Sequence, residues 1–111
     1  MVKKEAPLRS GIYKVSLDPT RGHEQRGYRP VVIISPDTYN STSNLVLICP
    51  ITSKQKGYPF EVQCEGKKIH GVILVDQIRA LDYRTRKLSF VEKLGTVTMQ
   101  EVREKLVALI E

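Results

Sequence analysis

The chain contains no tryptophan, only two cysteines and few aromatic residues of any kind (6%). No apolar stretch approaches the ~20 residues that a membrane-spanning helix needs, and no basic and apolar leader opens the sequence. Cys49 and Cys64 lie in apolar segments without the spacing of metal ligands, which favours buried free thiols over a disulfide or a metal site. With 111 residues, of which 41% are hydrophobic, the chain is expected to form a single domain over residues 1–111 in the cytoplasm.

The sequence also has few of the residues that metal or nucleotide chemistry requires. Only two histidines are present, and the carboxylates are scattered without a D-x-D or H-x-x-x-H pair, so no Mg²⁺ or Zn²⁺ site and no cofactor is expected. Gly22 and Gly27 have the spacing of a phosphate-binding loop. However, Tyr28-Arg29 stands where that loop requires Lys-Ser/Thr, and a strand follows where a helix should begin. No nucleotide hydrolase is predicted.

Positive charge is what the chain has in excess. The formal net charge is +6 at pH 7, and residues 1–30 hold seven Lys/Arg against three Asp/Glu. A basic balance of this size favours a polyanionic partner, most simply nucleic acid.

Short apolar segments separated by turn residues predict a mainly β fold. Strands are expected at residues 12–17, 31–35, 45–49, 60–64, 71–75 and, more weakly, 88–97. The runs 31–35 and 45–49 are apolar throughout, as in strands covered on both faces. Phe60, Val62 and Cys64 alternate with polar residues and are expected to face the core. This pattern is typical of a small barrel or a sandwich.

Two helices and two polar turns complete this prediction. Ser35-Pro36 is expected to open a short helix that ends near residue 40, and Thr98 with Glu101 forms a capping box before an amphipathic C-terminal helix. Residues 82–87 are too polar for a strand and predict a turn. His70 is interpreted as a solvated turn residue.

The most informative segment is the polar stretch 18–30, which is unusually long for a connection without a core-forming pattern. Its polar and aromatic side chains are Arg21, His23, Glu24, Gln25, Arg26, Tyr28 and Arg29. These groups can bind a phosphodiester and move protons. RNA can be cleaved without a metal because its 2′-hydroxyl is a built-in nucleophile, provided that a base, an acid and donors around the phosphorus are present. Arg29 suits the phosphate because its planar fork meets two oxygens, and Pro30 restrains it to an extended backbone.

A second polar loop, residues 52–59, follows the strand at 45–49. It offers hydroxyls, cations and an aromatic ring, as single-stranded nucleic acid binding requires: Thr52, Ser53, Lys54, Lys56 and Tyr58. Phe60 is expected to close the barrel. Asp76 and Gln77 end the strand at 71–75, and Asp76 is either buried with a raised pKa or bonded to loop amides.

These stretches resemble the MazF/PemK-like toxins of bacterial toxin–antitoxin pairs. The resemblance rests on DPTRGHEQRGYRPVVIIS, SPDTYN, PITSKQKGYPFEV and GVILVDQIR, which occur in the same order in that family. It runs from about Gly11 to the C-terminal helix. Several of the matched stretches are polar loops, which a shared fold alone does not require.

The resemblance implies an SH3-like small barrel with appended helices and a C-terminal amphipathic helix. It implies a homodimer that acts as a metal-independent endoribonuclease on single-stranded RNA and leaves 2′,3′-cyclic phosphate and 5′-hydroxyl ends. RNA is expected in a groove across the dimer. A MazE-like antitoxin with an acidic C-terminal tail is expected to fill that groove and silence the toxin.

The family's essential arginine falls on Arg29 in G-Y-R-P and its essential threonine on Thr52 in P-I-T-S. Its acidic loop position falls on Glu24 in G-H-E-Q. Arginine is a poor general base because its pKa exceeds 12. Arg29 is therefore assigned to the phosphate and to protonation of the leaving group, and Thr52 to orienting the phosphate. Glu24 is the first choice of base and His23 the second, with Asp76 as a further alternative.

Two other functions stay open at this point. CcdB-like proteins share this fold type and inhibit DNA gyrase by direct contact, but they rely on a C-terminal aromatic segment, whereas this chain ends in VALIE. An SH3-like module that binds RNA without cleaving it explains the basic loops. It does not explain Glu24, whose charge repels phosphates.

Overall fold

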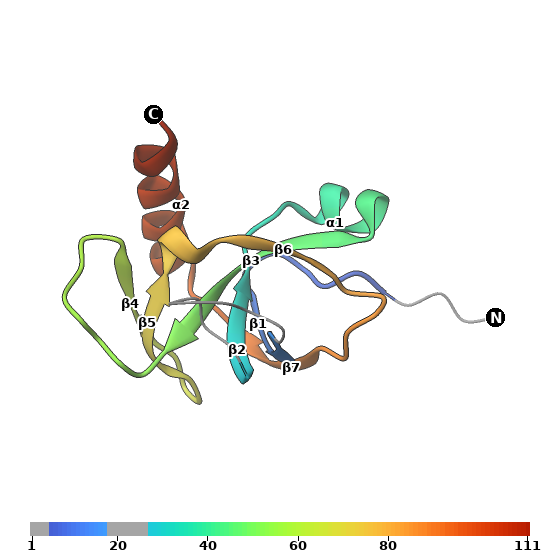
Figure 1. Ribbon diagram of the computed structural model, residues 1–111, viewed down its shortest axis with the longest axis horizontal. Coiled ribbons are helices and arrows are strands. Elements are labelled where there is room, and N and C mark those ends of the chain that lie inside the picture. Colours follow the sequence, from blue (N-terminus) through green and yellow to red (C-terminus); the bar gives the residue numbers. More distant parts are fainter. Residues whose placement is uncertain (1–4, 18–26) are drawn as a thin grey trace.

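The computed structural model describes residues 5–17 and 27–111, and the statements below concern these residues. The elements in chain order are β1 (Gly11–Ser16), β2 (Tyr28–Ile33), α1 (Asp37–Ser43), β3 (Leu45–Thr52), β4 (Glu61–Glu65), β5 (His70–Leu74), the 3₁₀ turn η1 (Val75–Gln77), β6 (Arg79–Asp82), β7 (Ser89–Lys93) and α2 (Thr96–Ile110). All strand pairs are antiparallel. The prediction of a mainly β fold with a C-terminal helix is confirmed (Figure 1).

Strand β3 organises the sheet, whose order is β4-β5-β3-β2-β1-β7 with β6 also paired to β3. One edge of β3 pairs with β2. The other edge is divided, because Leu45–Ile48 pair with β6 and Ile51–Thr52 pair with β5. The sheet therefore branches along β3, and Thr52 lies at the end of the branch that leads to β5.

Both faces of β2 and β3 are buried, as their continuous apolar runs predict. Val32 and Cys49 belong to one core cluster, which α2 covers with Met99 and Val102. Val31 and Ile48 belong to the other cluster, which Tyr83 helps to fill. Cys49 and Cys64 are free, buried thiols, as expected.

The strand predictions fail by two residues or more in four places, and the first is β3, which runs to Thr52 instead of ending at residue 49. Strand β6 was not predicted, because it is short and only Leu81 in it is fully buried. Strand β2 begins at Tyr28, so the end of the polar stretch 18–30 is strand rather than loop. Strand β7 ends at Lys93, whereas the prediction extended it to residue 97. His70 is exposed as expected, but it opens β5 instead of lying in a turn.

Both predicted helix caps are wrong. Helix α2 begins at Thr96 after Gly95, with no side-chain cap, so Thr98 and Glu101 lie inside the helix. Helix α1 follows Pro36, and Ser35 does not cap it. The Ser35 hydroxyl is instead buried, bonded to Asn40 Oδ1 and accepting from the Leu47 N–H at 2.9 Å. The Ser35 hydroxyl therefore takes part in a tertiary contact and does not cap the helix.

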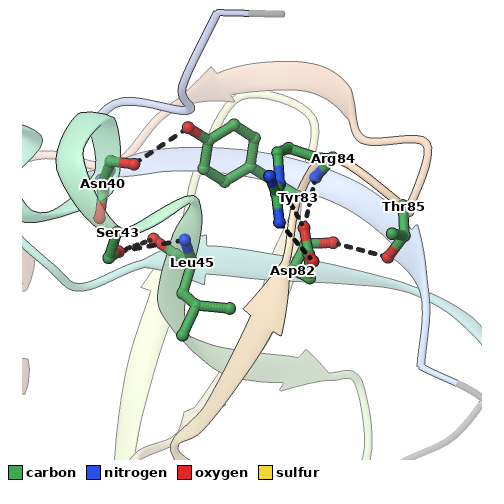
Figure 2. A network of polar contacts seen from close by, with 7 residues as sticks. All are labelled: Asn40, Ser43, Leu45, Asp82, Tyr83, Arg84 and Thr85. Carbon is green, nitrogen blue, oxygen red and sulfur yellow. Dashed lines mark hydrogen bonds and ion pairs between the residues drawn. The ribbon is translucent and has the colours of Figure 1, made fainter.

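The turn after β6 joins the sheet to α1 (Figure 2). The Tyr83 hydroxyl donates to the Asn40 carbonyl at 3.0 Å, and the Asp82 carboxylate accepts from the Arg84 N–H at 2.9 Å. The Arg84 side chain contributes most to holding the pKa of Asp82 below its ordinary value. This confirms the predicted turn from Tyr83 onward. No helix within the two described ranges is long and apolar enough to cross a membrane.

The hairpin between β4 and β5 is held by a carboxylate from β7. Glu92 accepts the backbone N–H groups of Lys67, Lys68 and Ile69 at 2.9, 2.8 and 2.8 Å. The Lys68 N–H is the largest cause of the lowered pKa of Glu92. A carboxylate with a lowered pKa in the folded state stabilises that state while it is ionised.

Glu92→Gln is therefore expected to lower the free energy of unfolding at pH 7. Because the folded-state pKa is lowered, the contribution of Glu92 is complete above its ordinary pKa of 4.5 and is lost as the pH falls through the folded value. The difference between the two proteins should thus shrink in acid. Urea unfolding at pH 7 and pH 3 measures it, with Glu104→Gln on the exposed face of α2 as control. A difference that does not change with pH would contradict this role.

Candidate functional site

A cavity of about 470 Å³ lies between the β3–β4 loop (residues 53–60) and η1. Its lining residues are Thr52, Lys54, Lys56, Tyr58, Phe60, Glu61, Leu74, Asp76 and Gln77. Two polar segments that the sequence analysis selected separately, residues 52–59 and 76–77, therefore form one site. The β3–β4 loop projects beside β4 and β5, at a distance from α1 (Figure 1).

The strand pairing of β3 and β5 positions the threonine. Thr52 pairs with Val72 and is only 4% exposed, although it lines the cavity. Its Oγ1 accepts the Lys54 N–H at 3.2 Å. Because a hydroxyl has one donor and two acceptor positions, this bond leaves the Thr52 proton available for a second partner.

Arg29 is half-buried on β2, the strand on the other side of β3. The pairs Val31↔Pro50, Val32↔Cys49 and Ile33↔Ile48 define the register of these strands. The last of these pairs is Val31↔Pro50, and Arg29 and Thr52 each lie two residues beyond it, which by strand alternation is the same face. Directly opposite residues of an antiparallel pair share a face. The pairing thus indicates that both side chains leave the sheet on one side.

Cations and an exposed aromatic ring surround the mouth of the cavity. Lys56 Nζ lies 5.9 Å from the centre of the Tyr58 ring, which is 57% exposed. Lys54 is exposed on the same loop. An exposed ring beside one ammonium group, with a second lysine lining the same cavity, suits a stacked base with its phosphates. The arrangement can therefore bind a single-stranded polyanion.

Two expectations about this site were wrong. Phe60 does not close the barrel, because it is 39% exposed and lines the cavity. Asp76 is not buried, because it stands exposed on η1. The remaining predicted residues divide into two groups. Ser53 and Tyr28 are exposed but do not line the cavity, whereas Arg21, His23, Glu24, Gln25 and Arg26 lie outside the described residues.

Gly71 belongs to the site although sequence reasoning missed it. A Cβ built on Gly71 lies 2.9 Å from the Thr52 carbonyl carbon and 3.3 Å from Ser53 Cα, and the backbone φ is +152°. Only a residue without a side chain lets β5 approach Thr52 this closely. A glycine inside a strand was the available signal, since it marks a bulge or a close backbone approach.

Thiolate and metal chemistry receive no support from the described side chains. Burial, with a smaller contribution from the Asp76 charge, raises the pKa of Cys49 to about 12, so this thiol stays protonated at neutral pH. No group of three or more His, Cys, Asp or Glu within residues 5–17 and 27–111 is placed to hold a metal ion.

The family model of the PemK-like, MazF-like toxins of type II toxin–antitoxin systems matches residues 8–110. The chain belongs to this toxin family. It is 40% identical over 103 residues to the endoribonuclease toxin MazF of Escherichia coli K12, which covers 93% of this chain and 90% of that relative. It is 33% identical over 116 residues to the Escherichia coli endoribonuclease PemK, covering 99% of this chain and 87% of the relative.

Solved structures of this toxin family have the same fold. The crystal structure of MazF from Deinococcus radiodurans matches with a TM-score of 0.89 and 37% identity, over 96% of this chain and 98% of that one. A MazE-MazF crystal structure from the same organism matches with a TM-score of 0.83 and 35% identity, over 95% and 96% of the two chains. The predicted family and its small SH3-like barrel with a C-terminal helix are confirmed.

The match to the toxin family includes every residue of the cavity and Arg29. All of them lie within residues 8–110. The two strands that carry Arg29 and Thr52, and the loop that carries the exposed ring and the lysines, thus belong to the part of the chain that the family shares.

Proposed function

We propose that this toxin is a metal-independent endoribonuclease that cleaves single-stranded RNA at short sequences. The observation that carries the proposal is the cavity in which Thr52, two lysines and an exposed tyrosine meet. Arg29 does not line this cavity and lies on β2, the strand that pairs with β3. The relatives that are named endoribonucleases cover nearly the whole chain and point to the same activity.

The residues that line the cavity suit single-stranded RNA. Tyr58 offers a ring face on which a base can stack, and Lys54 and Lys56 compensate phosphate charge. Asp76 and Gln77 supply an acceptor and an amide on the opposite wall, where base edges can be read. Ser53, Tyr28, Arg21, Gln25 and Arg26 are proposed to contact the RNA as well. The net charge of +6 favours the encounter with RNA.

The cleavage step needs no group beyond the chain and the RNA. A base removes the 2′-hydroxyl proton, the 2′-oxygen attacks phosphorus, and the bond to the 5′-oxygen breaks. The products are a 2′,3′-cyclic phosphate and a 5′-hydroxyl, which takes up a proton. Arg29 holds the non-bridging oxygens and protonates the leaving oxygen, and Thr52 orients the phosphate. Glu24 is proposed as the base, with His23 and then Asp76 as alternatives.

The proposal includes the partners of the toxin. The related Deinococcus radiodurans MazF has been crystallised with MazE. We infer a cognate MazE-like antitoxin whose acidic C-terminal tail pairs with Lys54 and Lys56 at the cavity and competes with RNA. We also infer a homodimer with RNA in the groove between the copies, one domain over residues 1–111, and action in the cytoplasm, where mRNA is available.

Cleavage in the presence of excess EDTA tests the reaction directly. The purified toxin, free of antitoxin, is incubated with a long unstructured RNA, and the cut sites and end groups are mapped. Discrete cuts with cyclic-phosphate and 5′-hydroxyl ends are expected. Binding without cleavage would favour an RNA-binding module, and trapped DNA breaks in a gyrase assay would favour a CcdB-like inhibitor.

Thr52→Ala is expected to reduce the rate of RNA cleavage by about 10²-fold, as is usual when one donor to a developing charge is removed. The buried position of Thr52 makes Thr52→Ser the matched control, because it keeps the hydroxyl and loses only a methyl group. Single-turnover cleavage of a short RNA measures both variants. Equal rates for the alanine variant and the wild type would remove Thr52 from the reaction.

A further inference from the structure

The β3–β4 loop is held from inside by a carboxylate that follows it. Glu61 is the first residue of β4, and its carboxylate accepts two backbone N–H groups of the loop. The Lys56 N–H lies 3.2 and 3.1 Å from its two oxygens, and the Gly57 N–H lies 2.9 Å from Oε1. Gly57 has a φ of +77°, which a glycine adopts without strain. These bonds close the loop between Lys56 and Tyr58, the residues that flank the cavity mouth.

Helix α2 holds the same loop from outside. Lys105 Nζ donates to the Pro59 carbonyl at 2.8 Å and to the Glu61 carbonyl at 3.1 Å. Between these two carbonyls, that of Phe60 accepts the Val75 N–H at 3.1 Å. Three consecutive carbonyls at the end of the loop are thus fixed to α2 and to η1. Because η1 carries Asp76 and Gln77, the bond between Val75 and Phe60 fixes the loop side of the cavity to its η1 side.

Two further bonds order the loop, from the Lys54 N–H to Thr52 Oγ1 and from the Glu61 N–H to the Tyr58 carbonyl, but apolar core contacts do not. Most of its side chains are exposed, and no described residue between 53 and 59 belongs to either core cluster. Segments with few buried apolar contacts open at low cost, so their geometry depends on polar anchors. Each mobile side chain that RNA must immobilise reduces affinity.

We propose that Glu61 and Lys105 are positioning residues that hold Lys54, Lys56 and Tyr58 in their RNA-binding geometry. Neither is assigned to the reacting phosphate, which Arg29 on β2 and Thr52 on β3 are proposed to hold. That the substrate is RNA rests on the proposed function. That Glu61 and Lys105 anchor the loop can be tested on the toxin without RNA.

The first experiment measures the loop without RNA. Trypsin cleaves after lysine, so Lys54 and Lys56 report on loop opening. Lys105→Ala and Glu61→Ala are expected to speed tryptic cleavage at these two sites by about tenfold, since each removes hydrogen bonds to or from a charged group. Lys105→Arg keeps donors for the carbonyls and should stay close to wild type. Glu104→Ala is the control, because it removes a carboxylate from an exposed position of the same helix.

The second experiment measures steady-state cleavage of a short single-stranded RNA that contains one mapped cut site. Lys105→Ala and Glu61→Ala are expected to raise KM by about tenfold and to leave kcat within about twofold, because they weaken binding rather than chemistry. Lys105→Arg should restore most of the KM. Thermal unfolding shows whether each variant is folded at the assay temperature.

The two experiments separate failure of this inference from failure of the proposed function. Unchanged tryptic rates in both alanine variants would overturn the anchored loop, whatever the RNA result. A fall in kcat at unchanged KM would overturn positioning in favour of a chemical role. If the wild type cleaves no RNA, the nuclease proposal fails while faster tryptic cleavage still supports the anchors. Binding of a short single-stranded RNA, measured by anisotropy, then replaces KM.

Discussion

Arg29→Ala is expected to reduce RNA cleavage by about 10³-fold, the largest effect of any single side chain in this toxin. Loss of one preorganised donor to a developing oxyanion typically costs 10²- to 10³-fold, and the guanidinium supplies two donors and a fixed charge. Arg29 stands half-buried on β2, two residues before the first residue of that strand that pairs with β3, and it pairs with Val15 of β1. It is therefore held by the sheet rather than by a loop. Single-turnover cleavage of a short RNA with one cut site measures the loss.

Two further variants identify the property of Arg29 that matters. Arg29→Lys keeps the charge but not the planar fork, so it should recover only part of the rate. Arg103→Ala removes an arginine from an exposed position of α2 and should leave cleavage unchanged. Circular dichroism and thermal unfolding of Arg29→Ala must show a folded protein. Wild-type cleavage by folded Arg29→Ala would remove this residue from the mechanism.

The parts of the fold that the sequence predicted are those with a strong local pattern. The apolar runs at 31–35 and 45–49 lack alternation, and β2 and β3 are indeed covered on both faces. The alternation at Val62 and Cys64 likewise matches their full burial. A buried strand must carry this pattern wherever it pairs, so the pattern can be read without knowing its neighbours.

The parts that failed depend on neighbours distant in the sequence. Strand β6 exists because β3 offers it an edge, with pairs such as Val46↔Leu81. The ring of Tyr83 is likewise buried by distant residues of the second core cluster, and its hydroxyl bonds to the Asn40 carbonyl of α1. The Thr98 capping box has the right residues, but the helix begins at Thr96, before it. Tertiary context overrides such local signals, since each is worth only about 1 kcal/mol.

The same distinction applies to the site. Thr52, Lys54 and Tyr58 could be selected because polar and aromatic side chains in a long loop have no core to fill. Glu61 and Lys105 could not be selected. Glu61 reads as the polar position of an alternating strand, and Lys105 meets the loop across 46 residues of sequence. Residues that arrange other residues become visible only when the chain is folded.

Gly71→Ala is expected to lower the free energy of unfolding by about 2–4 kcal/mol, because the new Cβ meets backbone and the positive φ strains an L-residue. The nearest atoms are the Thr52 carbonyl group and Ser53 Cα. The strand pair between Thr52 and Val72 holds this part of β3 in place. The end of β3 must therefore move, and Thr52 with it. Urea unfolding measures the loss of stability. Cleavage per folded molecule should also fall, by about tenfold or more, because small displacements of a positioning group reduce rates strongly.

Gly95→Ala is the control for this prediction. Gly95 precedes α2 with a φ of −65°, and its built Cβ meets nothing within 4 Å. Alanine there should cost less than about 1 kcal/mol and leave cleavage per folded molecule unchanged. If Gly71→Ala lost stability but kept full cleavage per folded molecule, the strand would have relaxed without moving Thr52. If it lost neither, β5 would not approach Thr52 as closely as the structure places it. Loss of both stability and cleavage in Gly71→Ala, with neither lost in Gly95→Ala, would show that β5 holds the end of β3 that carries Thr52 by backbone contact.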